Sequence, residues 1–138
     1  MNLDVIIVAT CNLAQSFVDA TQMIVGPRPN LHAVRCDESG DMIKTGNLMA
    51  EMIQGSRADF TIIFTDSYGS TPTGAALLSI AKCNNAAVIT GVNLISIIQA
   101  LELSEESANS RALMKSIERD SRSGIRIITG EDVLDTRG

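Results

Sequence analysis

The sequence predicts an α/β fold, a doubly wound and mainly parallel sheet flanked by helices. Short apolar runs alternate with segments of helical periodicity, which is the pattern of strand–helix–strand units with right-handed crossovers. The runs are rich in Val and Ile, as in parallel strands that are buried on both faces. The 138 residues are 45% hydrophobic, enough for a substantial core, and we expect residues 1–138 to form one domain.

Five apolar runs are the expected strands. Each is four to eight residues long and bounded by turn residues or by a helical pattern. In chain order they are Val5–Thr10 (with Leu3 and Asp4 leading in), Leu31–Cys36, Phe60–Thr65, Ala86–Thr90 and Ile125–Thr129.

Five helices are expected between and after these strands, from apolar residues at helical spacing and from capping residues. The third starts at Thr71, a good N-cap residue, followed by a proline at the first helical position. The fifth is charged and amphipathic, and we expect a polar tail at Gly130–Gly138. The expected spans are Leu13 to Gly26, Met42 to Gly55, Thr71 to Ile80, Asn93 to Leu101, and Ser104 to about Arg122.

Composition excludes several classes of protein. The net charge of −5 disfavours binding to a nucleic-acid backbone, and an aromatic content of 3% disfavours a base-stacking platform. The N-terminal apolar run is short and carries Asp4, so we expect neither a signal peptide nor a membrane span. Three cysteines without CxxC spacing predict no disulfide framework, no metal site and a reducing cytosol. No cofactor is expected.

Polar residues follow the first and third strands, where ligands gather in a doubly wound sheet. Asn12 and Gln15 are a plausible capping pair for the first helix, and the turn at Asp66–Pro72 leads into the third. Two helix N-termini at one cleft would bind an anion through free amides and hydroxyls. The alternative is that the hydroxyls only cap helices. The candidate anion-binding residues are Thr10, Asn12, Leu13, Ser67, Ser70 and Thr71.

Cys11 stands at the first helix N-terminus, where the positive end of the helix favours a nucleophilic thiolate. The alternative is a buried, inert cysteine, which is a common environment for a free thiol. A carboxylate nearby, Asp66, would disfavour the thiolate. The single histidine, His32, precedes the second strand's core at the opposite end from the cleft, so a Cys–His dyad is disfavoured. We expect Cys36 near the cleft edge and Cys83 in packing.

Three segments together resemble the EIIA domain of the mannose-type sugar phosphotransferase system. That family has a strand followed by Thr-His-Gly, a strand ending in Asp followed by Gly-Gly-Ser/Thr-Pro and Asn, and a later Gly-Val-Asn. The segments are VIIVATCNLAQSFVDATQMIVG, FTIIFTDSYGSTPTGAALL and AAVITGVNLISIIQAL, with matches at Thr10, Asp66, Gly69, Thr71, Pro72, Gly91, Val92 and Asn93.

The departures fall on the active site. Cys11 matches the phosphoacceptor histidine and Asn12 the glycine after it, while Ser70 and Gly74 replace a glycine and an asparagine. The resemblance implies a phosphoryl relay in which an HPr-like phosphocarrier gives phosphate to the EIIA domain, which passes it to an EIIB-like protein. In that relay Asp66 orients the histidine through its second ring nitrogen, which a thiol lacks.

The resemblance also implies a cytoplasmic homodimer in which Ile125–Thr129 adds to the partner's sheet, with association to a membrane permease complex. Three readings stay open. The chain is a relay that carries phosphate on Cys11, a phosphotransfer-inactive relative that binds a partner or regulates, or an unrelated anion-binding domain. A deep apolar cleft would favour the last. A dihydroxyacetone-kinase phosphotransfer subunit has the same fold and is a further alternative.

Overall fold

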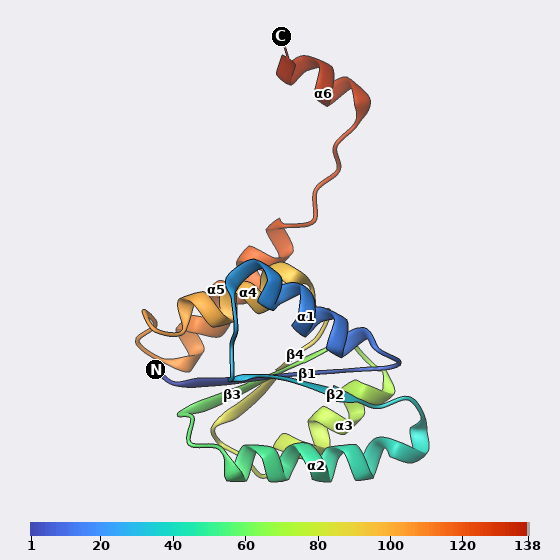
Figure 1. Ribbon diagram of the computed structural model, residues 1–138, viewed down its shortest axis with the longest axis vertical. Coiled ribbons are helices and arrows are strands. Elements are labelled where there is room, and N and C mark those ends of the chain that lie inside the picture. The colour runs from blue at the N-terminus through green and yellow to red at the C-terminus, as the bar shows by residue number, and fades with distance from the viewer. Residues whose placement is uncertain (138) are drawn as a thin grey trace.

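A four-stranded parallel sheet lies between two layers of helices in the computed structural model, which describes residues 1–137 (Figure 1). The strand order is β2-β1-β3-β4, so β1 and β3 are central and β2 and β4 are edges. The prediction of a parallel α/β sheet is confirmed. The strands are β1 (Leu3–Ala9), β2 (Leu31–Arg35), β3 (Phe60–Thr65) and β4 (Ala86–Ile89).

The helices divide between the two faces of the sheet (Figure 1). Helices α1, α4 and α5 cover one face, and α2 and α3 cover the other. A short 3₁₀ turn, η1 (Ser39–Asp41), precedes α2, and α6 follows a projecting segment. Their bounds are α1 (Leu13–Val25), α2 (Met42–Gly55), α3 (Thr71–Ile80), α4 (Leu94–Leu103), α5 (Ser110–Ser123) and α6 (Gly130–Arg137).

The central strand β1 serves both layers because successive side chains of a strand point to opposite faces. Val5 and Ile7 pack with Val18 of α1 and with α4 and α5. Ile6 and Val8 pack with Met49 of α2 and with α3. These strand residues are all essentially inaccessible to solvent. The unbroken apolar run that predicted β1 is therefore explained by burial on both of its faces.

The strand register brings two polar turns to one edge of the sheet. Val8 pairs with Thr65 of β3, and Ala9 pairs with Arg35 of β2. Because the strands are parallel, the segments after β1, β2 and β3 all emerge at this carboxyl edge. The Cys11 turn is thus between the loop after β2 and the turn that starts at Asp66.

The C-terminal segment differs from its prediction. Ile125–Thr129 was expected as a strand, but in this single chain it has no regular structure and projects away from the layers (Figure 1). A strand needs a neighbour to satisfy its backbone groups, and among residues 1–137 this segment pairs with no strand. The tail expected to be irregular contains α6 instead, and Gly138 lies outside the described residues.

The N-terminal caps of three helices also differ from their predictions. The expected helix from Ser104 begins at Ser110, because Asn109 accepts a hydrogen bond from the backbone N–H of Ala112 and acts as N-cap. The N-cap of α3 is Ser70, one residue before the expected Thr71. Asn12 makes no side-chain cap, and Gln15 donates to Asp19 instead. The predicted Asn93 cap is confirmed, within a reciprocal capping box.

Candidate functional site

Cys11 occupies a left-handed turn between β1 and α1. Its φ angle is 53°, and it is the one non-glycine residue with a positive φ among residues 1–137. The residue is exposed, so the alternative of a buried thiol is wrong. Its backbone N–H donates to Asp37 Oδ1 at 2.6 Å, which ties the turn to the loop after β2.

Arg35 and Asp37 form an ion pair beside this turn. Arg35 Nε lies 2.5 Å from Asp37 Oδ2, and Arg35 Nη1 reaches Asn12 Oδ1 at 3.4 Å. The N–H of Cys11 and then the hydrogen bond from Arg35 hold the pKa of Asp37 below its ordinary value. The hydrogen bond and charge of Asp37 raise the pKa of Arg35, and the Cys11 side chain adds a smaller effect of the same sign. Asp37 therefore links Arg35 to the backbone of Cys11.

Asp66 is engaged within its own turn. Its Oδ1 accepts from the backbone N–H of Ser67 at 2.8 Å and from the Ser70 hydroxyl at 2.6 Å. The Ser70 hydroxyl in turn accepts from the Thr73 N–H as the cap of α3. Within residues 1–137, no hydrogen bond joins this turn to the Cys11 turn. The two turns share an edge of the sheet, but each has its own network.

The remaining candidate residues fall around these turns. Thr10 is half-buried, and its carbonyl accepts from the N–H of Leu13 at 3.3 Å. Leu13 is exposed at the start of α1, as is the neighbouring Asn12. Ser67 is exposed, while Thr71 is half-buried at the first position of α3. The Ser70 hydroxyl thus caps α3, while the N-terminus of α1 beside Cys11 is accessible to solvent.

The other titratable candidates lie apart from the turn. His32 is at the far end of the sheet, with Nε2 3.9 Å from Asp4 Oδ1, as expected. Cys36 is fully buried, and the Cys83 thiol lies 3.6 Å from the Ser79 carbonyl oxygen. Sequence reasoning did not single out Arg35 and Asp37. The available signal was their position on either side of Cys36, which was expected near the cleft edge.

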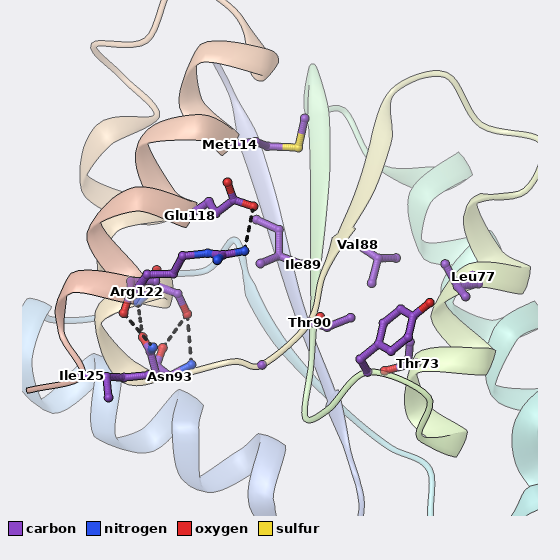
Figure 2. A pocket seen from close by; sticks show the side chains of 14 residues that line it. Thr73, Leu77, Val88, Ile89, Thr90, Asn93, Met114, Glu118, Arg122 and Ile125 are labelled. Atoms are coloured by element: carbon purple, nitrogen blue, oxygen red, sulfur yellow. Dashed lines mark hydrogen bonds and ion pairs between the residues drawn. The ribbon is translucent and has the colours of Figure 1, made fainter.

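A groove of about 550 Å³ opens beside the edge strand β4, and Tyr68 of the Asp66 turn is among its lining residues (Figure 2). Apolar side chains from β4 and α5, including Val88, Ile89 and Met114, line much of it. Arg122 and Glu118 of α5 form an ion pair of 3.6 Å across its rim. Neither Cys11 nor Asp66 lines this groove. The apolar space expected of an unrelated ligand-binding domain is thus away from the Cys11 turn.

Comparison with known families decides the family. Residues 4–118 match the family model EIIA-man, described as the PTS system fructose IIA component.

The chain belongs to this family.

The EIIA-man match spans β1 to α5 and thus both polar turns. The chain is also similar to the sorbose-specific EIIA component of the phosphotransferase system of Lacticaseibacillus casei. The two are 26% identical over 92 residues, which are 67% of each protein. The protein is therefore an EIIA-type component of the sugar phosphotransferase system.

Solved structures agree on the fold of this EIIA component. The mannose/sorbose-specific IIA subunit from Enterococcus faecalis has a TM-score of 0.80 at 22% identity, with 94% of this chain and 96% of that chain covered. Phosphotransferase system component EIIA from Streptococcus agalactiae has a TM-score of 0.75 at 21% identity, covering 91% and 96%. Among residues 1–137, no helix is both long and apolar enough to cross a bilayer.

Proposed function

We propose that this EIIA component receives a phosphoryl group from an HPr-like phosphocarrier on Cys11 and passes it to an EIIB-like partner. The observation that carries the proposal is the exposed thiol of Cys11 at the position that matches the family's phosphoacceptor, at the N-terminus of α1. A phosphoryl group there would face free amides and the positive end of the helix. The family implies both partners and a location in the cytoplasm, beside a permease complex.

The transfer step balances with the Cys11 thiol as acceptor. The P–N bond of the donor's phosphohistidine breaks as the S–P bond to Cys11 forms, and the thiol proton goes to the released imidazole. Phosphoryl transfer depends mainly on positioning and on stabilisation of charge. Asp66 is held within its own turn, because Ser67 and Ser70 donate hydrogen bonds to its carboxylate, and these bonds keep it negatively charged.

One observation favours a second function, a phosphotransfer-inactive EIIA that binds a partner. Asp66 is committed to its own turn, whereas a relay with a histidine would use it to orient the ring. A protein in this class would keep the fold and the docking surface and lose the acceptor chemistry.

Reconstitution separates the two functions. The protein is incubated with phosphoenolpyruvate, enzyme I and HPr, and its mass is measured under conditions that preserve thiophosphates. A relay gains one phosphate on wild type, and Cys11→Ser loses it. If wild type gains none and Cys11→His gains one, the relay through Cys11 is excluded, and the second function is supported.

We further propose that the protein is a homodimer in which Ile125–Thr129 adds to the partner's sheet. Ile125, Ile127 and Ile128 are 81%, 91% and 72% exposed, which is costly for side chains of this size. Strand β4 is an unpaired edge, and an apolar groove lies beside it. Pairing the segment with a partner's β4 would bury both surfaces and remove the exposed edge.

Two truncations test the assembly by size-exclusion chromatography with light scattering. A chain that ends at Thr129 keeps the apolar segment and should remain a dimer. A chain that ends at Gly124 lacks it and should be a monomer. A shorter chain that still forms the wild-type dimer would exclude this segment as the interface.

A further inference from the structure

We propose that Arg35 is a second functional group of the Cys11 site, a cation that binds the oxygens of an anionic group arriving at the thiol, and that Asp37 positions it. The inference deepens the proposed phosphoryl relay and rests on it for the identity of the anion. Nothing in the family pattern described above includes either residue.

The fold places Arg35 at the thiol by strand register. It is the last residue of β2 and pairs with Ala9, two residues before Cys11. The Asp37 carboxylate accepts hydrogen bonds from both the Cys11 N–H and Arg35 Nε, and Arg35 Nη1 reaches the neighbouring Asn12 side chain. The guanidinium is therefore beside the turn and not at the far side of the sheet.

Asp37 fixes both partners with one carboxylate. One oxygen accepts the Cys11 N–H at 2.6 Å, and the other accepts Arg35 Nε at 2.5 Å. This bridge joins the cation to the backbone of the thiol-bearing residue. The orientation of Arg35 relative to Cys11 is thereby set by two hydrogen bonds to the two oxygens of one carboxylate.

Arg35 still has donors for a ligand. Its Nε is used by Asp37, and Nη1 has the long contact to Asn12, while Nη2 has no hydrogen-bond partner within residues 1–137. A guanidinium presents several donors in one plane, which suits two oxygens of a phosphoryl group. The side chain is 59% exposed, so an incoming group can reach it.

The cation has a clear electrostatic task. The protein carries a net charge of −5, Asp37 binds the Cys11 N–H, and Asp66 follows the neighbouring strand β3 at the same edge of the sheet. A doubly charged phosphoryl group that forms an S–P bond at Cys11 adds negative charge to this already acidic edge. Arg35 offsets that charge where the P–N bond of the donor breaks and the S–P bond forms.

The field at Cys11 is measurable without phosphotransfer, by comparing two alkylating reagents. Iodoacetate is an anion and iodoacetamide is neutral, so the ratio of their rates at one thiol reports local charge and not the amount of thiolate. Peptide mass mapping assigns each rate to Cys11 and not to Cys36 or Cys83. Removing one nearby positive charge should lower the iodoacetate-to-iodoacetamide ratio by about threefold or more.

Four variants give the expected pattern. Arg35→Gln lowers the ratio, Arg35→Lys keeps it near wild type, and Asp37→Asn raises it because the guanidinium is then not neutralised. Arg57→Gln is the matched control, since this exposed arginine precedes β3 at the opposite end of the sheet, and it leaves the ratio unchanged. A ratio that is the same in wild type and Arg35→Gln overturns the proposal, provided that circular dichroism shows both folded.

Phosphoryl transfer from HPr, followed by mass, is the second readout. If wild type takes no phosphate but the ratio shows the expected pattern, the relay fails and Arg35 stands as an anion-binding residue. If wild type is phosphorylated and Arg35→Gln is phosphorylated at the same rate, the role of Arg35 in transfer is refuted while the relay stands. Slower transfer in Arg35→Gln, with recovery in Arg35→Lys, supports both.

Discussion

Replacing Gly46 with alanine tests the close packing of α2 against α3. A Cβ at Gly46 would lie 3.0 Å from the backbone oxygen of Ala75 and 3.1 Å from Leu78 Cβ. The first of these atoms belongs to the backbone of α3, whose N-terminus is held by the Ser70 cap. The helix thus has little freedom to move away, and the added methyl overpacks the interface.

Two opposing effects set the expected change in the free energy of unfolding for Gly46→Ala. Overpacking a well-packed interface costs about 1–3 kcal/mol, and a backbone obstacle favours the upper part of that range. Glycine to alanine in a helix returns about 1 kcal/mol through backbone entropy. We therefore expect Gly46→Ala to lower the free energy of unfolding by about 1–2 kcal/mol. The melting temperature should fall by roughly 3–5 °C for each kcal/mol.

Gly55→Ala is the matched control, because Gly55 ends the same helix and no atom lies within 4 Å of its Cβ position. It should be as stable as wild type or gain up to about 1 kcal/mol. Urea unfolding followed by circular dichroism measures both variants. If Gly46→Ala is as stable as Gly55→Ala, the inferred close contact between α2 and α3 does not exist.

Three further predictions concern polar groups. Thr21→Val should raise the free energy of unfolding by about 1 kcal/mol, because the Thr21 hydroxyl is buried without a hydrogen-bond partner in the described residues. Thr73→Val removes a bonded hydroxyl and should lower the free energy of unfolding by about 1–3 kcal/mol; a change of the opposite sign for either variant in urea unfolding would contradict the prediction. Asn93→Ala removes a capping box and should lower the free energy of unfolding by about 1 kcal/mol. Asn12→Ala should lower it by less than half of that, because the Asn12 side chain makes no cap. Equal losses of stability in thermal melts would contradict this difference. The pKa of Asp37 is lowered in the folded state, so its contribution to the free energy of unfolding is complete above the ordinary pKa and is lost as the pH falls through the folded pKa. When the free energy of unfolding is measured against pH in the acid range, Asp37→Asn should lack this loss. A curve for Asp37→Asn that runs parallel to wild type would contradict the prediction.

The strands and most helices were predictable because local pattern and tertiary burial agree. The run at Val5–Thr10 is apolar since β1 is covered on both faces, and the apolar stripe of the first helix faces the same core. The turn at Asp66 was placed at the correct edge by the general rule for parallel sheets. The Asn93 cap followed from a local preference that no tertiary contact overrides.

The remaining features depend on partners that sequence pattern does not specify. Ile125–Thr129 has the composition of a strand, but it pairs with no strand among the described residues. Asp66 and Asp37 each have several possible hydrogen-bond donors nearby in the sequence or fold. The geometry of their turns decides which donors they bind, and the sequence pattern does not show that geometry. Asp37 in particular binds the Cys11 amide, 26 positions away, and such a contact leaves no periodic signal.

The left-handed conformation of Cys11 limits which residues can occupy the acceptor position, whatever chemistry they bring. A φ of 53° is unfavourable for β-branched side chains, and it is tolerated better by asparagine, aspartate and histidine. Histidine, which the family pattern has at this position, is therefore compatible with the same turn. A cysteine and a histidine can therefore occupy this position on the same backbone, without rebuilding the loop. Threonine or valine at this position would be destabilised by the positive φ, whatever the reactivity of the side chain.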